Sequence, residues 1–288
     1  MRTASILVGW KGPAAPRRVR LVAPRWILIL AAAAIAMMGA AEPGRASDVE
    51  AVAEVAGLDA RAIAQRAEDV LRSDATMLHA RMTVESPRLG KPRVVEFQSW
   101  DDRRGDRAFI RILAPSKDKD TTFLRLPPNL WTYIPRDERS MRISPSMLLQ
   151  PWMGSDFSHD DLVNESSDVE DYDHRLIRVD EVDGGKKAYV LEYIPHEDTP
   201  VVWAKIVAWI EVEHATPLRQ EFYDENDVLV RSVTFSDVRN LDGRHVPHLW
   251  TMKPMQKKGY ETRIQIIEFV FDVELDDTIF TTRQLKTR

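Results

Sequence analysis

Ser155, Asp156 and His159 are the residue types of a hydrolase triad and lie within one short segment. A triad is assembled from distant parts of a chain, and the G-x-S-x-G turn that exposes a serine nucleophile is absent from this sequence. Asp156 and Ser158 are better explained as caps of backbone amides at a turn, with Ser158 and Asp161 as a variant of the capping box. We therefore expect no catalytic residue and predict that the protein is not an enzyme.

The sequence also gives little support for a metal-binding or a phosphate-binding site. The acidic run over residues 168–173, which ends beside His174, could hold Ca²⁺, but it lacks the glycine and the ligand spacing of an EF-hand loop. The seven histidines show no zinc-binding spacing. The glycine pair Gly184-Gly185 lacks the spacing of a phosphate-binding loop and is typical of a hairpin turn. We expect no metal and no cofactor.

Residues 139–164 form a long irregular segment that is too apolar for a solvated loop and is interrupted by Pro145, Pro151 and Gly154. Such a segment either covers a core or closes a cavity for an apolar ligand, because methionine adapts to irregular shapes. We predict that Met147–Phe157 is a movable lid.

Four residues are expected to have polar or conformational roles in this lid. Gly154 is the predicted flexible point, and Asp156 and Ser158 are predicted to fix the far end of the lid. Arg142 precedes the lid and could meet a lipid headgroup or the carbonyl of a lipoprotein. A surface ion pair with a nearby acid is the alternative for Arg142.

Large aromatic and methionine side chains are scattered over the predicted strands and this segment. Such residues usually fill cores, but here they are also candidates to line an apolar cavity. The candidate lipid-binding residues are Trp131, Tyr133, Met147, Trp152, Met153, Phe157, Trp203, Trp209, Trp250 and Met252.

Helical spacing of apolar residues appears once, over Asp59–Ser73. Beyond it, alternation and turn residues predict about eleven strands in sequential antiparallel order. We expect one mainly β domain, a strongly curved sheet whose concave face is covered by the helix and by residues 144–165. The predicted strands are 77–84, 94–100, 107–113, 123–126, 130–134, 140–143, 172–182, 187–194, 203–212, 217–223, 228–238, 246–253 and 262–273.

Residues 1–46 have the pattern of a secretory signal peptide, with a basic region, an apolar run and small residues before cleavage after Ala41 or Ala46. An uncleaved membrane anchor is the alternative. The chain has no cysteine to carry a lipid, so the mature protein, residues 47–288, is expected to be soluble. The segment holds seven of the lysines and arginines but one acid, so its removal makes a chain of net charge −5 more acidic. Nucleic acid is therefore not an expected partner.

Several ordered motifs, spread over residues 92–285, carry a resemblance to a known family. They are Met153–Leu162, Asn129–Pro135, Trp203–Ile206 and Phe280–Leu285. Together they resemble the outer-membrane lipoprotein-sorting proteins, the LolA-like family of bacterial envelopes. The resemblance implies a half-barrel with a helical lid over a hydrophobic cavity.

The resemblance also implies a function. Such folds carry acyl chains across the periplasm, so the expected role is a periplasmic carrier of lipids or lipoproteins, with an inner-membrane transporter and an outer-membrane acceptor as partners. The cargo is expected to be a lipoprotein, a free lipid, a hopanoid or a glycolipid. The alternative is an accessory or docking protein of an envelope lipid transporter of the resistance-nodulation-division class. A monomer is expected.

Overall fold

The computed structural model describes residues 57–159, 161, 169–182, 184–197 and 203–287. All of them belong to one compact unit, Ser47–Arg288. The predicted signal peptide, with its two cleavage positions, lies outside the described residues.

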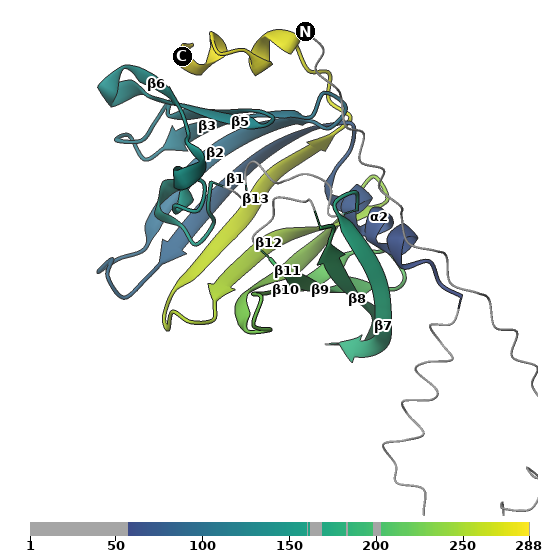
Figure 1. Cartoon of the computed structure of the whole chain (residues 1–288). Helices are drawn as coiled ribbons and strands as arrows, with labels where there is room; N and C mark the ends of the chain where they lie inside the picture. The colour runs from purple at the N-terminus through teal and green to yellow at the C-terminus, as the bar shows by residue number, and fades with distance from the viewer. Residues whose placement is uncertain (1–56, 160, 162–168, 183, 198–202, 288) are drawn as a thin grey trace, which may run out of the picture. The chain divides into compact units, whose positions relative to one another are not determined.

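Thirteen strands form one antiparallel sheet in the order β6-β5-β4-β3-β2-β1-β13-β12-β11-β10-β9-β8-β7, which is curved and not closed (Figure 1). Every predicted range is a separate strand, so the expected count of about eleven was wrong. The strands are β1 Ala75–Glu85, β2 Arg93–Asp102, β3 Arg107–Ala114, β4 Thr122–Leu126, β5 Asn129–Ile134, β6 Arg139–Arg142, β7 Tyr172–Val182, β8 Lys186–Pro195, β9 Lys205–Glu211, β10 Pro217–Tyr223, β11 Leu229–Leu241, β12 Arg244–Pro254 and β13 Glu261–Phe271.

Short hairpins between neighbouring strands follow from local turn chemistry. In the β11–β12 turn, the side chain of Asn240 accepts a hydrogen bond of 2.8 Å from the amide of Gly243, which has a φ of +90°. In the β10–β11 turn, the carboxylate of Asp224 accepts hydrogen bonds from the amides of Asn226 and Val228 at 2.9 and 3.0 Å. Asn, Asp and Gly favour such turns for these reasons, so the sequence fixes hairpins here.

The β6–β7 connection is different, because these two strands are the opposite edges of the sheet. The chain between them must cross from one edge to the other. It contains the irregular apolar segment, with short 3₁₀ turns at Pro145–Met147 and Trp152–Gly154. The topology therefore places this segment over the inner face of the half-barrel.

A single helix longer than one turn occurs among the described residues, α2 at Ala60–Leu71, close to the predicted Asp59–Ser73. Asp59 caps it, since its carboxylate accepts hydrogen bonds from the amides of Arg61 and Ala62 at 3.0 and 3.2 Å. The buried side of the helix packs in the same cluster as the inner faces of β9 and β12. This side consists of Ile63, Ala64, Ala67 and Val70.

Apolar side chains cover both faces of the sheet near β3–β5. Leu130 packs on the inner face with Trp152, whereas the adjacent Trp131 packs in a separate cluster with Phe280 and Leu285. Consecutive residues of a strand point to opposite faces, so this second cluster lies on the outer face. The C-terminal 3₁₀ turns, Asp277–Phe280 and Gln284–Lys286, cover it.

Candidate functional site

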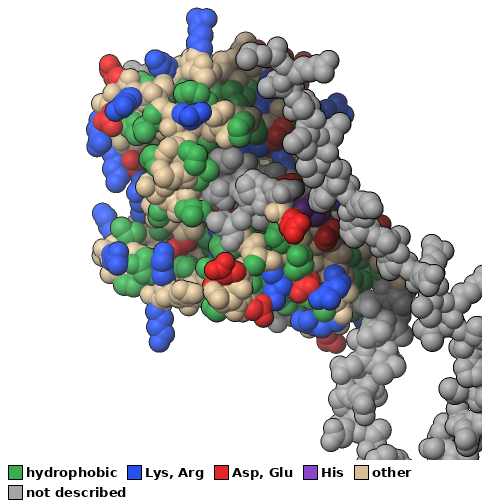
Figure 2. Space-filling model, in the orientation of Figure 1, with side chains coloured by type: hydrophobic (Ala, Val, Ile, Leu, Met, Phe, Trp, Pro, Cys, Tyr) green, Lys and Arg blue, Asp and Glu red, His purple; other side chains and the backbone are tan. Residues whose placement is uncertain are grey.

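A cavity of about 370 Å³ lies between the inner face of the sheet, α2 and the segment around Trp152 and Phe157. Most of its lining is apolar and aromatic and comes from both halves of the sheet. A smaller part of the wall is charged and includes residues where α2 meets the end of β2 and the pair of Asp161 and Arg231. On the surface seen in Figure 2, by contrast, hydrophobic side chains are spread among charged ones. The interior is therefore the place for an apolar ligand.

Six of the candidate lipid-binding residues border this cavity, namely Trp152, Phe157, Trp203, Trp209, Trp250 and Met252. The ring of Trp203 makes an edge contact with Phe222 at 5.3 Å between centroids. The indole of Trp250 donates a hydrogen bond of 3.0 Å to the carbonyl of Pro247. These contacts fix the two rings in the wall.

Trp131 and Tyr133 were expected in the cavity, but they do not border it. Trp131 and Tyr133 pack in the outer-face cluster. Trp209 borders the cavity, but its indole donates to Asp180 at 3.0 Å and lies 4.9 Å beneath the guanidinium of Arg219.

The strand register explains why the indole of Trp209 reaches Asp180 and Arg219. On β9 the inner-face side chains are Ala208 and Ile210, which belong to the inner cluster. Trp209 lies between them and therefore points outward. Both faces of this strand are apolar, so alternation alone could not decide which face was inner.

Met147 and Met153 were also expected in the cavity. They pack instead against the inner-face cluster around Trp152 and do not border the cavity. Both side chains cover core residues.

Trp152 is the main anchor of the predicted lid. Its ring is 2% exposed and makes edge contacts with Phe97 and Phe123, at 5.4 and 5.9 Å between centroids. A hydrogen bond of 2.7 Å from the Trp152 amide to the carbonyl of Phe157 closes the loop. Gly154 has a φ of +76°, and a side chain there would approach Arg93, so glycine suits this turn. Its role as a flexible point stays a prediction.

Among the described residues, the Asp156 carboxylate caps no backbone amide, contrary to expectation. Its backbone N–H donates to the Thr262 hydroxyl at 3.0 Å, and that hydroxyl donates to the Asp156 carboxylate at 2.7 Å. The loop is thereby attached to β13, a partner too distant in sequence to be predicted.

Ser158 does form the predicted pair with Asp161. The Asp161 carboxylate accepts a hydrogen bond of 2.7 Å from the Ser158 backbone N–H, and the Asp161 backbone N–H donates to the Ser158 hydroxyl at 3.2 Å. Arg142 donates to the amide oxygen of Asn129 at 3.0 Å rather than to an acid.

Replacing Thr262 with valine is expected to lower the free energy of unfolding by about 1–2 kcal/mol, because it removes both hydrogen bonds to Asp156 at a fully buried position. Amide hydrogen exchange over residues 152–158 should increase with it. Thr234→Val, at an exposed site on β11, is the matched control. If both variants lose equal stability, the attachment to β13 contributes nothing specific.

Sequence reasoning missed an ion pair at the cavity wall. The guanidinium of Arg231 donates two hydrogen bonds to the Asp161 carboxylate, at 2.9 and 2.7 Å. It also lies 4.4 Å from the ring of Trp203 and 4.3 Å from that of Phe222. The sequence held one signal for this ion pair, because Arg231 alternates with Val233 and so lies on the apolar face of β11.

The Asp161 side chain is only 18% exposed. Burial alone would raise the pKa of Asp161. The hydrogen bonds and charge of Arg231, with those of Ser158, outweigh burial and hold the pKa below its ordinary value. Asp161 is therefore a carboxylate in the folded protein, and it ties the end of the lid segment to β11.

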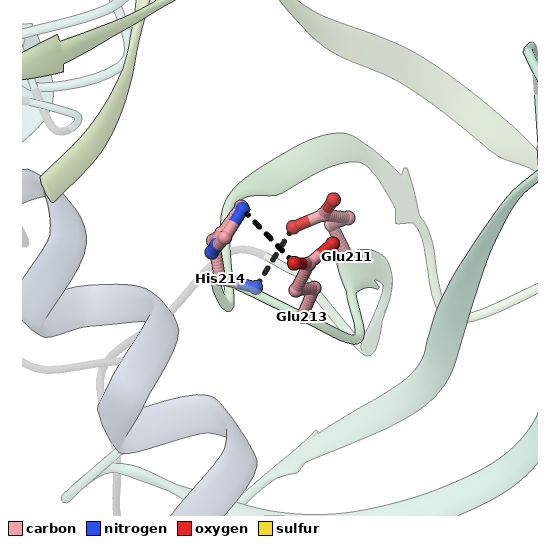
Figure 3. A group of neighbouring side chains, drawn as sticks. All are labelled: Glu211, Glu213 and His214. Atoms are coloured by element: carbon pink, nitrogen blue, oxygen red, sulfur yellow. Dashed lines mark hydrogen bonds and ion pairs between the residues drawn. The ribbon is translucent and has the colours of Figure 1, made fainter.

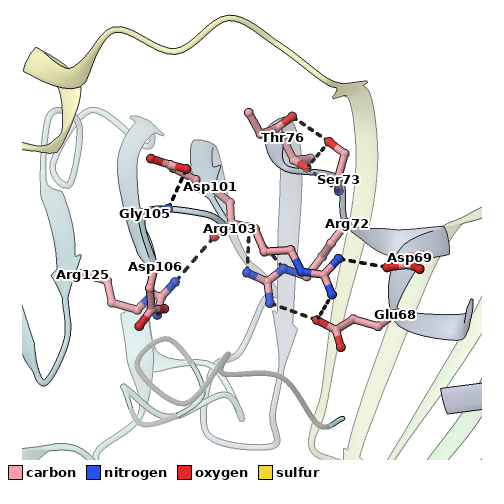
Figure 4. Close-up of polar contacts among 12 residues, drawn as sticks. Glu68, Asp69, Arg72, Ser73, Thr76, Asp101, Arg103, Gly105, Asp106 and Arg125 are labelled. Atoms are coloured by element: carbon pink, nitrogen blue, oxygen red, sulfur yellow. Dashed lines mark hydrogen bonds and ion pairs between the residues drawn. The ribbon is translucent and has the colours of Figure 1, made fainter. Parts of the chain in front are cut away.

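The charged part of the cavity wall is a network around Asp101 (Figure 4). One oxygen of Asp101 accepts from Arg72 Nε and Nη2, at 3.2 and 2.9 Å. Glu68 lies between Arg72 and Arg103, at 3.5 and 3.2 Å. The network links α2 to the β2–β3 hairpin.

Glu211, Glu213 and His214 form a second polar group, at the β9–β10 turn (Figure 3). Glu211 accepts from the backbone N–H of His214 at 2.9 Å and pairs with Lys186 at 3.4 Å. The imidazole of His214 stacks on that of His245 at 3.6 Å. These contacts hold a turn, and we assign no metal to the group.

Comparisons with known proteins agree with this geometry. Residues 104–287 match a family model whose description reads only "-like: Uncharacterized protein". No curated protein matches the chain. Among the described residues, no helix is long and apolar enough to cross a membrane.

Three solved structures are similar over most of the chain. A DUF1329 family protein from Desulfovibrio piger is 26% identical, with a TM-score of 0.70 over 79% of this chain and 98% of that one. A putative outer membrane lipoprotein-sorting protein domain from Vibrio parahaemolyticus is 25% identical, with a TM-score of 0.67 over 78% and 97%. A LolA superfamily protein from Nitrosomonas europaea is 21% identical, with a TM-score of 0.66 over 79% and 100%, and shows the shared fold.

Proposed function

Because the chain belongs to the family of LolA-like outer-membrane lipoprotein-sorting proteins, we propose that it is a periplasmic carrier that shields acyl chains in its cavity during transfer towards the outer membrane. The observation that carries the proposal is the largely apolar internal cavity of about 370 Å³, closed on one side by the Trp152–Phe157 segment. Each methylene buried there contributes about 0.8 kcal/mol, so one acyl chain binds without polar contacts.

Export is part of this proposal. Removal of residues 1–46, or of the first 41, would deliver a chain without cysteine, and hence without a lipid anchor, to the periplasm. N-terminal sequencing of periplasmic material should find Glu42 or Ser47 first. A full-length chain in the membrane fraction would contradict this part of the proposal.

Trp203→Ala and Trp250→Ala are each expected to weaken binding of a neutral fluorescent probe, N-phenyl-1-naphthylamine, by about tenfold. Both rings border the cavity, and each loses a large apolar contact area with the ligand. Fluorescence titration measures the change, and mass spectrometry of lipid extracted from the purified protein identifies the natural cargo.

Trp131→Ala is the matched control, because the same side chain is removed from the outer-face cluster, away from the cavity. It is expected to lower stability but to leave probe affinity within about twofold of the wild type. Equal loss of affinity in all three variants would show that the tryptophans act only through stability. A docking protein with a vestigial cavity, the alternative function, would show no probe binding to begin with.

A further inference from the structure

Arg125 is a charged side chain buried in the inner wall of the half-barrel, with 2% of its side chain exposed. In the strand register, Arg125 of β4 pairs with Ala108 of β3, which pairs with Asp101 of β2. The methyl group of Ala108 is too short to separate its two neighbours. The guanidinium and the carboxylate therefore face each other across it, with 3.6 Å between Nη2 and Oδ1 (Figure 4).

Hydrogen-bonding capacity remains on both sides of this gap. Arg125 Nη1 donates to Asp106 at 2.7 Å, but Nε and Nη2 are buried without a hydrogen-bond partner among the described residues. Asp101 Oδ1 is likewise buried and accepts no hydrogen bond there, because both bonds from Arg72 go to Oδ2. Buried donors and acceptors are costly to leave unpaired, so the pair is suited to a polar group that enters from the cavity. Asp101 and Ala108 both border that cavity, and Arg125 lies one strand further along, next to Ala108, without bordering the cavity itself.

The charge of the network decides what kind of group fits. Three guanidinium groups, of Arg72, Arg103 and Arg125, are paired with four carboxylates, of Glu68, Asp69, Asp101 and Asp106, so the network has no positive charge to spare. A phosphate or carboxylate would add an unpaired buried charge and would meet Asp101 directly. A neutral hydroxyl group, in contrast, accepts from Nη2 and donates to Oδ1 at the same time.

We propose that Arg125 and Asp101 form the headgroup subsite of the cavity and select a neutral lipid that carries a hydroxyl group. The acyl chain of this lipid extends from the subsite along the apolar wall that includes Trp203 and Trp250. The proposal rests on the proposed carrier function, which it deepens by naming the class of cargo.

Competition against N-phenyl-1-naphthylamine with three lipids of equal chain length tests the selection. The lipids are 1-palmitoylglycerol, palmitate and 1-palmitoyl lysophosphatidate. The expected result is displacement of the probe by 1-palmitoylglycerol at concentrations about tenfold lower than for either anionic lipid, since a bridging hydroxyl pairs both charged groups. A preference for palmitate or lysophosphatidate would overturn the neutral headgroup.

Two variants locate the subsite. Asp101→Asn is expected to reduce the preference for 1-palmitoylglycerol about tenfold. Ala108→Val removes no charge, and its added methyl groups fill the gap between Arg125 and Asp101, so it should abolish the preference while the protein remains folded and binds the probe. Arg239→Gln, at an exposed ion pair with Asp237, is the control and should keep the preference.

The outcomes separate the two proposals. Wild-type protein that binds neither the probe nor any of the lipids would remove the carrier function itself. Probe binding with equal displacement by all three lipids, unchanged in Ala108→Val, would keep the carrier and overturn the subsite.

Discussion

Replacing Trp152 with alanine is expected to lower the free energy of unfolding by about 3–5 kcal/mol. The indole is the largest fully buried side chain, and it packs edge-on against Phe97 and Phe123. Its removal leaves a cavity between the lid segment and the inner face, which the surrounding strands cannot fill. Urea unfolding followed by circular dichroism measures the loss.

Trp152→Phe is the control, and it is expected to cost less than about 2 kcal/mol. The indole N–H makes no hydrogen bond among the described residues, so phenylalanine gives up ring volume but no polar partner. A loss in Trp152→Ala as small as that in Trp152→Phe would mean that the lid segment is not anchored by this ring. The segment would then be a loosely attached cover.

Most strands could be predicted from the sequence because their causes are local. Alternation marks each strand, and residues such as Asp224 and Asn240 make turns with their own neighbours in the chain. The long β6–β7 connection was also recognisable, since no regular period runs through it. The count of about eleven strands was too low, since each of the thirteen predicted ranges forms a separate strand.

The site was less predictable, because its contacts join residues far apart in sequence. Asp156 meets Thr262, and Arg125 meets Asp101 across a third strand. The face to which a tryptophan points was a further difficulty. On β9, buried residues occupy both faces, so alternation did not reveal that the indole of Trp209, which borders the cavity, also contacts Asp180 and Arg219.

Asp161→Asn is expected to lower the free energy of unfolding at neutral pH by about 2–3 kcal/mol, because it leaves the Arg231 guanidinium without its charged partner between two aromatic rings. Hydrogen exchange over residues 147–157 should increase in the variant, since the end of the lid segment loses its attachment to β11. In the wild type, bound lipid is expected to change exchange over the same residues more than over β9 and β13, as a movable lid requires. Asp237→Asn, in an exposed ion pair, is the control and should leave both stability and exchange over residues 147–157 close to the wild-type values.

The stability lost in Asp161→Asn is expected to depend on pH, in the direction set by the lowered pKa of Asp161. The pKa of Asp161 is lower in the folded protein than the value of about 3.9 expected in the unfolded chain, so its ion pair stabilises the fold above that value. The contribution is lost as the pH falls below about 4 and through the folded pKa. The stability difference between the wild type and Asp161→Asn should therefore be constant from about pH 5 upwards and shrink in more acidic solution. A difference that stays the same down to about pH 2 would show that packing around residue 161, rather than its charge, holds the end of the lid.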